Sequence, residues 1–137
     1  MGMAPGQLPG QISLHDHNKS GLIGWPNLPE DEGMTTDQIL ESAANGEIDV
    51  LFLLGTDPLS DYRDPDLAKK ALETTNTVIA VDLFVNPSVY QSDIIFPAAA
   101  FIESNGSHTN VEGRVTPIRQ KVTSPGTSRP DWMIAAE

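Results

Sequence analysis

The sequence predicts an α/β fold built on a short, mainly parallel sheet with long connecting loops. Short, almost wholly apolar runs end at Gly55, Asp82 and Pro97, as strands of a parallel sheet do. A helical pattern separates the first two runs, and a connection from strand to helix to strand is nearly always right-handed and parallel. Glycine and proline, with eleven residues each, indicate the long loops.

The chain divides into two parts. Residues 1–34 are expected to be irregular, because glycines and prolines interrupt any periodicity, and to run over a surface that lies outside this sequence. Residues 35–137 are expected to form a partial α/β domain. A helix beginning at Arg129 still continues at Glu137, so the sequence reads as a segment cut from a longer protein within its C-terminal helix.

The first predicted helix follows Thr35 and Thr36, either of which can cap its N-terminus. Asp37 lies in the first turn, where a negative charge complements the helix dipole. Asn45-Gly46 is a typical helix end, since glycine readily adopts the left-handed conformation needed there. The residues at helical spacing that form its apolar face are Ile39, Leu40, Ala43 and Ala44.

The first predicted strand covers residues 48–54 and is expected to be buried on both faces. Asp64-Pro65 then opens a second helix, with proline at its first position. Residues 77–81 form the second strand. The apolar face of the helix between the two strands consists of Leu67, Ala68, Ala71 and Leu72, while Lys69 and Lys70 face outwards.

The remaining elements are shorter. Asn86-Pro87 can start a short helix, and residues 93–96 form a third strand that Pro97 closes. Beyond it, Asn105-Gly106 is the strongest turn signal. Residues 115–122 are expected to be extended or paired with another strand.

Composition excludes several function classes. Residues 1–100 carry fifteen acidic and four basic side chains, which accounts for the whole net charge of −11 and disfavours nucleic-acid binding. Without cysteine, thiolate zinc sites and iron–sulfur ligation are excluded from this segment. No apolar run approaches the ~20 residues of a membrane span, and we expect no direct membrane insertion. The C-terminal part of the sequence carries four basic residues, Arg114, Arg119, Lys121 and Arg129. They offer the best place for an anionic ligand, although ordinary solvated surface charge also explains them.

Neither a metal site nor a catalytic nucleophile is predicted. His15-Asp16-His17 has no third ligand at a readable spacing. Ser104 and Ser107 lie near His108, but no nucleophile-elbow pattern surrounds them.

A candidate binding site lies at the predicted carboxyl ends of the strands, where open parallel sheets bind ligands. Gly55-Thr56-Asp57-Pro58 follows the first strand, and Asp82 ends the second. Glycine allows close approach of the backbone, and a carboxylate there can bind a ribose or a base. The same residues could also form a structural corner and cap loops. The spacing lacks the Gly-x-Gly-x-x-Gly pattern of nicotinamide dinucleotide sites.

The segment from Ser92 to Arg114 stands out because a strand leads into small residues and then a dense polar cluster around two glycines. Such a cluster either satisfies the backbone groups of a long loop or binds a polyfunctional ligand. Its polar members are Glu103, Asn105, Thr109, Asn110, Glu112 and Arg114.

These residues resemble the signature of the molybdopterin oxidoreductase family. The resemblance rests on Ser92-Asp93-Ile94-Ile95-Phe96-Pro97, on Glu103 and Gly106, and on Thr109-Asn110-Val111-Glu112-Gly113-Arg114, in that order. It extends upstream to Gly55-Thr56-Asp57-Pro58 and downstream to Asp131-Trp132. It implies a Rossmann-like three-layer fold that holds one guanine dinucleotide arm of the molybdenum cofactor. The residues it places near that arm are Gly55, Thr56, Asp57 and Asp82.

Within the family, the segment around Pro5-Gly6 and the loop at Trp25-Pro26 resemble the G subunit of bacterial NADH-quinone oxidoreductase, with formate dehydrogenase and nitrate reductase as alternatives. This implies a structural role in a respiratory complex, with no cofactor in the segment itself and iron–sulfur clusters elsewhere in the parent chain. Molybdopterin guanine dinucleotide is possible in the parent. The implied partners are the remainder of its own subunit and the other subunits, on the cytoplasmic side of the cell membrane.

Overall fold

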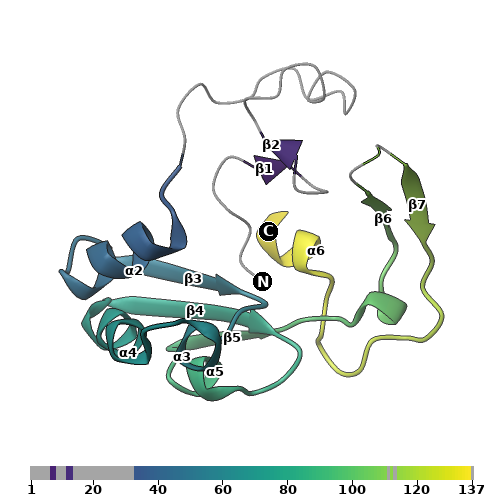
Figure 1. The fold of residues 1–137 in the computed structure, drawn as a ribbon. Coiled ribbons are helices and arrows are strands. Elements are labelled where there is room, and N and C mark those ends of the chain that lie inside the picture. Colours follow the sequence, from purple (N-terminus) through teal and green to yellow (C-terminus); the bar gives the residue numbers. More distant parts are fainter. Residues whose placement is uncertain (1–6, 9–11, 14–32, 111, 113, 137) are drawn as a thin grey trace.

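The computed structural model describes residues 7–8, 12–13, 33–110, 112 and 114–136 (Figure 1). Its centre is a three-stranded sheet with helices packed beside it, followed by a hairpin and a C-terminal helix. Within residues 1–34, which were expected to be irregular, two short strands pair antiparallel: β1 (Gln7–Leu8) and β2 (Ile12–Ser13).

The central sheet is parallel, as predicted, with the strand order β3-β4-β5. In its register, Phe52 of β3 lies beside Ile79 of β4, which lies beside Ile94 of β5. The outer edge of β3 is unpaired among the described residues. The three strands are β3 (Val50–Leu54), β4 (Thr77–Asp82) and β5 (Ile94–Pro97).

Helix α2 (Thr36–Ala44) is capped at its N-terminus by Thr35, one of the two predicted caps. The Thr35 hydroxyl accepts the Gln38 N–H at 3.2 Å, and the Gln38 side chain accepts the Thr35 N–H at 2.8 Å. This reciprocal capping box satisfies two backbone donors that the helix itself cannot pair. Asn45 caps the C-terminus of the helix, and Gly46 follows with φ of +76°.

Helix α4 (Pro65–Thr74) provides the crossover between β3 and β4. Asp64 caps it by accepting the Leu67 N–H at 3.0 Å. Two helices of one turn each, α3 (Pro58–Asp61) and α5 (Pro87–Tyr90), follow the carboxyl ends of β3 and β4. The periodicity of the sequence did not predict α3, because four residues are too few to show a helical pattern.

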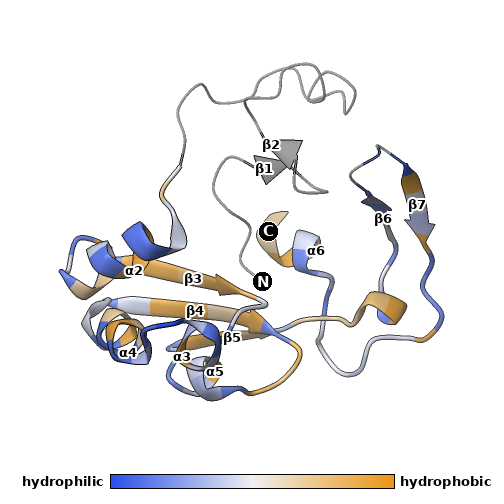
Figure 2. Ribbon diagram, in the orientation of Figure 1, coloured by the Kyte–Doolittle hydropathy of each residue, from blue (hydrophilic) through white to orange (hydrophobic). Residues whose placement is uncertain are grey.

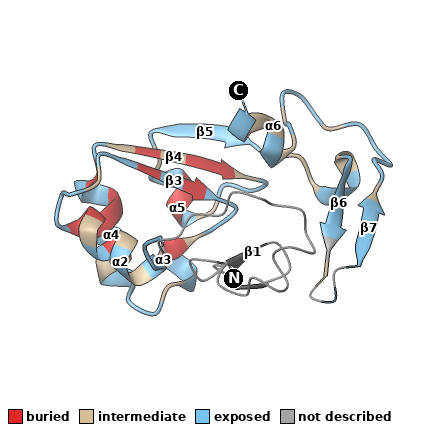
Figure 3. Cartoon of the chain, turned by 90° about the horizontal axis from the view of Figure 1, so that it is seen from above, coloured by how far each residue is buried: buried red, intermediate tan, exposed pale blue. Residues whose placement is uncertain are grey.

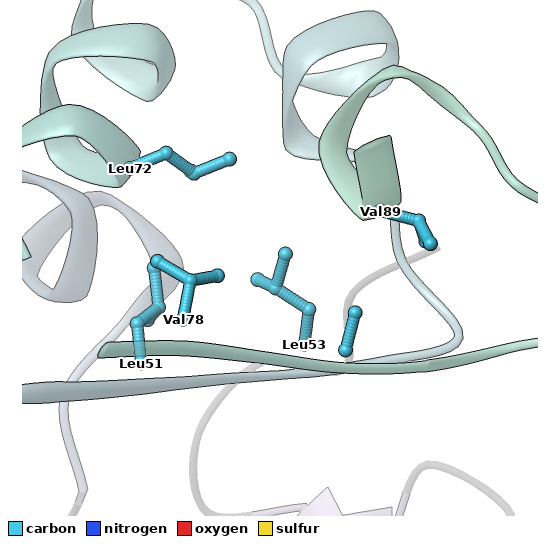
Figure 4. Close-up of a cluster of buried hydrophobic side chains, with 6 residues drawn as sticks. Leu51, Leu53, Leu72, Val78 and Val89 are labelled. Carbon is cyan, nitrogen blue, oxygen red and sulfur yellow. The ribbon is translucent and has the colours of Figure 1, made fainter. Parts of the chain in front are cut away.

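The core lies between one face of the sheet and the helices. Leu51 and Leu53 of β3 and Val78 of β4 point towards Leu72 of α4 and Val89 of α5 (Figure 4). A second cluster joins α2 to α4, whose small side chains let the two helices approach closely: Leu40, Ala43, Ala44, Ala68 and Ala71. Figure 3 shows that the buried residues are concentrated in these elements.

The opposite face of the sheet is apolar but largely open, which corrects the expectation that the first strand is buried on both faces. Burial alternates along β3, with Leu51 and Leu53 buried and their neighbours exposed. Among the described residues, the side chains of β3 that alternate with this buried pair remain uncovered, whereas Val81 of β4, in register with Leu54, is buried. The exposed apolar residues of this open sheet face are Val50, Phe52, Leu54, Ile94 and Phe96, and Figure 2 shows the strands as hydrophobic.

After β5, a short 3-10 helix (Phe101–Glu103) leads to a hairpin of β6 (Gly106–Thr109) and β7 (Val115–Ile118), and then to α6 (Asp131–Ala136). The prediction of a turn at Asn105-Gly106 was wrong. Gly106 already belongs to β6, and Asn105 accepts the Gln120 N–H at 3.1 Å across the two strands. The hairpin turns between Asn110 and Arg114 instead.

None of the described helices is long and apolar enough to cross a membrane.

Candidate functional site

The carboxyl ends of the three strands meet at one edge of the sheet, as parallel pairing requires. The Gly55 N–H donates to the Val81 carbonyl at 2.8 Å, and the Ala98 N–H donates to the Asp82 carbonyl at 3.0 Å. Both flanking turns are therefore bonded to the end of β4. Gly55 has φ of +57°, and the space that a Cβ atom would occupy there is open. Residues other than glycine rarely adopt this conformation.

A hollow of about 480 Å³ opens beside Gly55 and Thr56, between β3, α2 and α3. One of its walls is held by Asp37 at the start of α2, which accepts the Tyr62 hydroxyl at 2.6 Å and pairs with Arg63 at 2.7 Å. The hydrogen bond to Asp37 raises the pKa of Tyr62. The size of the hollow is within the range of small-molecule sites. Of the four predicted site residues, Gly55 and Thr56 line it.

Asp57 is directed into the protein. Its carboxylate accepts both the backbone N–H of Ser88, at 3.2 Å, and the Ser88 hydroxyl. Burial acts to raise the pKa of Asp57, but the side chains and backbone amides of Ser60 and Ser88 donate enough hydrogen bonds to lower it below its ordinary value. The carboxylate therefore stays charged at neutral pH and fixes the start of α5.

Asp82 organises the loop that follows β4. One carboxylate oxygen accepts the N–H groups of Leu83, at 2.6 Å, and Phe84, at 3.3 Å. The other accepts the side-chain amide of Asn86 at 2.9 Å. The structure thus places Asp57 and Asp82 at the same sheet edge as Gly55, as predicted, and gives both carboxylates partners within the chain.

The segment before α6 also reaches this edge. The Arg129 N–H donates to the Pro97 carbonyl at 3.1 Å, and the Ala99 N–H donates to the Arg129 carbonyl at 2.8 Å. Partial burial is the main cause that raises the pKa of Asp131, and the negative charge of Asp82 adds to it, against a hydrogen bond within Asp131 itself. Sequence reasoning named neither Asp131 nor Ser88 as site residues, because no spacing connects them to the strand ends.

The polar cluster in the segment from Ser92 to Arg114 largely serves its own backbone. The Asn110 side chain accepts the N–H groups of Glu112, at 3.0 Å, and Arg114, at 2.9 Å, and so shapes the hairpin turn. Glu103 accepts the Ala100 N–H at 2.9 Å. These contacts favour the first of the two interpretations of the cluster, in which it satisfies the backbone of a long loop.

Among the described residues, no group of acidic side chains and histidines is arranged to hold a metal ion. His15-Asp16-His17 lies outside those residues. His108 is in the exposed β6 strand.

Comparison with solved structures shows the fold. Acetylene hydratase from Pelobacter acetylenicus superposes on 71% of this chain with a TM-score of 0.64 at 20% sequence identity, and the chain spans 14% of that structure. This likeness supports the parallel α/β arrangement described above.

Curated relatives extend the comparison. NADPH-Fe(3+) oxidoreductase subunit alpha of Geobacter sulfurreducens is 33% identical over 100% of this chain and 16% of its own length. The assimilatory nitrate reductase catalytic subunit of Bacillus subtilis is 32% identical over 99% of the chain and 20% of its own length. A G subunit of NADH-quinone oxidoreductase from Rhizobium meliloti is 33% identical over 88% of the chain and 14% of its own length. The chain therefore spans one fifth or less of these relatives.

The family model for molybdopterin oxidoreductases matches residues 6–137, nearly the whole sequence. This match includes the strand-end turns and the hairpin that carries the sequence signature. The chain therefore belongs to the molybdopterin oxidoreductase family.

Proposed function

We propose that this chain is the part of an oxidoreductase subunit that holds one guanine nucleotide arm of a molybdopterin cofactor at the carboxyl edge of the β3-β4-β5 sheet. The observation that carries the proposal is the Gly55-Thr56 turn. It combines a left-handed glycine, open space beside it, and an adjoining hollow of about 480 Å³. A bulky nucleotide needs this kind of unobstructed backbone.

The residues present fit a nucleotide better than a metal. Gly55 and Thr56 would contact the nucleotide from the hollow, while Asp57 and Asp82 fix the two turns around it. When bound, the cofactor supplies the redox-active metal. The chemistry of this chain is then to bind and orient the far end of that group, and it contributes no acid, base or nucleophile to the reaction.

A titration with guanosine diphosphate tests this proposal. We expect shifts of the amide resonances of Gly55 and Thr56, and weaker shifts with adenosine diphosphate. Gly55→Val should abolish the response, because it strains the turn and fills the open space. Gly106→Val is the matched control, since that glycine lies in β6 without a positive φ. A wild-type chain that shows no shift at millimolar nucleotide would exclude the proposal.

A second candidate function is that of a structural domain in the G subunit of an NADH-quinone oxidoreductase. The 33% identity to the Rhizobium meliloti protein favours it. So does the engagement of both candidate carboxylates within the chain, because a packing domain needs them for its loops rather than for a ligand. The open sheet face would then pack against the remainder of its own subunit.

In this second role, iron–sulfur clusters elsewhere in the parent would carry electrons from NADH to quinone. Other subunits of the complex would be its partners, on the cytoplasmic side of the membrane. Metal analysis of the full-length parent protein separates the two functions. Stoichiometric molybdenum or tungsten, with guanine nucleotide released on denaturation, supports the first and excludes the second.

A further inference from the structure

Two groups of hydrogen bonds, joined through the backbone of α5, connect the turns that follow β3 and β4. The first group begins at Asp57, whose carboxylate accepts the N–H and hydroxyl of Ser88. The Ser88 oxygen in turn accepts the Leu59 N–H at 3.0 Å. Ser88 thus makes three hydrogen bonds with the segment that follows β3, although it lies about thirty residues further along the sequence.

The second group of hydrogen bonds begins at Asn86, which caps the short helix α5 that contains Ser88. The Asn86 side chain accepts the Val89 N–H at 2.9 Å and donates to Asp82 at 2.9 Å. Asp82 then binds the backbone after β4. The first turn of α5 therefore joins the two candidate carboxylates through a strand-end network of Asp57, Ser88, Asn86 and Asp82.

Burial gives this network its strength. Ser88 is 0% exposed and Val89 is 1% exposed, so water cannot replace the bonds made by the serine hydroxyl. A buried polar group without its partner is costly, and a hydrogen bond to a charged carboxylate is stronger than a neutral one. Simple helix capping does not account for this arrangement. The capping side chain of α5 is Asn86, whereas Ser88 binds a turn on another strand.

We propose that Ser88 and Asp57 are positioning residues, which hold the Gly55-Thr56 turn in fixed relation to the Asp82 turn so that a bound nucleotide meets both. This inference rests on the proposed nucleotide function. It assigns Asp57 a role different from direct contact with the ligand. The carboxylate acts through Ser88, and the nucleotide contacts are left to the turn that Asp57 supports.

The test compares Ser88→Ala, Asp57→Ala, their double variant, and Asp57→Asn in the 137-residue chain, with guanosine diphosphate as the probe. We expect each alanine variant to weaken binding by about tenfold, the equilibrium equivalent of one buried hydrogen bond. The double variant should lose less affinity than the two single losses multiplied together, because both variants remove the bond between the Ser88 hydroxyl and Asp57. Asp57→Asn should bind within about threefold of wild type, since its amide oxygen still accepts from Ser88.

Direct contact predicts a different pattern. A carboxylate that binds the N–H groups of guanine would make Asp57→Asn as damaging as Asp57→Ala and leave Ser88→Ala close to wild type. Either result overturns the positioning role. Ser88→Cys is the alternative if Ser88→Ala does not fold, because it keeps a small side chain and only a weak donor.

A readout without ligand separates this inference from the proposed function. In Asp57→Ala, amide resonances should shift at residues 86–89. In Asn86→Ala, they should shift at residues 55–57, across the network. Shifts confined to the mutated turn would show that the network does not join the two turns. If wild type binds no guanosine diphosphate, the nucleotide function fails, and these cross-turn shifts still decide whether the network couples the turns.

Discussion

Leu53 and Leu54 are adjacent in β3 and point to opposite faces of the sheet. Leu53 is 5% exposed in the core cluster, whereas Leu54 is 50% exposed on the open sheet face. The pair therefore allows one chemical change, leucine to alanine, to be made on both faces of a single strand. The difference in stability between the two variants measures how much more tightly the core face of the sheet is packed than the open sheet face.

The expected magnitudes follow from burial. Leu53→Ala removes about three buried carbon groups and leaves a cavity among Leu51, Leu72 and Val89, so it should lower the free energy of unfolding by ~3 kcal/mol. Leu54→Ala loses roughly half of the transfer free energy and creates no closed cavity, which gives ~1 kcal/mol. The first loss is a large part of the roughly 5–15 kcal/mol that stabilises a typical domain.

Urea denaturation followed by circular dichroism measures both variants against wild type. The two unfolding midpoints should differ clearly, with similar slopes, because neither change alters the surface exposed on unfolding by much. Equal losses for Leu53→Ala and Leu54→Ala would refute the one-sided core. That result would mean that the isolated chain covers its open face, for example by self-association, which sedimentation would reveal.

Three further predictions concern turns, caps and pH. Gly55→Ala should cost ~1 kcal/mol in urea denaturation, because its φ is +57°, whereas Gly106→Ala should change the midpoint little. Thr35→Ala removes half of the capping box of α2 and should cost ~1 kcal/mol, with a loss of helical signal in circular dichroism. The pKa of Asp57 is lowered on folding, so its contribution to stability is complete above its ordinary value of 3.8 and is lost as pH falls through the lower folded value. The pKa of Asp131 is raised, so Asp131 acts in the opposite direction: the folded state gains stability as pH falls through the raised value. Acid titrations of Asp57→Asn and Asp131→Asn should therefore change the pH dependence of the unfolding midpoint with opposite signs.

Local signals in the sequence predicted most of the central fold. Helix caps and apolar runs depend on neighbours within a few residues, so the sequence alone predicts them. The caps are Thr35 and Asp64, and the apolar runs end at Gly55 and Asp82. The position of the hairpin was not predicted correctly. Asn105-Gly106 is a strong turn pair by propensity, but pairing with β7 places it in a strand, and long-range pairing overrides local preference.

The candidate site was predicted by location and not by contact. Parallel pairing brings Gly55, Asp57 and Asp82 to one edge, and the sequence shows this order directly. It does not show that Ser88 binds Asp57, because that contact depends on how α5 folds back against the turn after β3. Nor does it show which face of β3 is covered, since an apolar run has the same composition in either case.

The open sheet face makes the folded chain an amphiphile. One side presents Val50, Phe52 and Phe96 to solvent, while the molecule as a whole carries a net charge of −11. In dilute buffer, mutual repulsion keeps such molecules apart. At about 1 M salt the screening length falls to about 3 Å and this repulsion is lost, although the apolar face is unchanged. Ionic strength should therefore control the colloidal behaviour of this chain while leaving its fold intact.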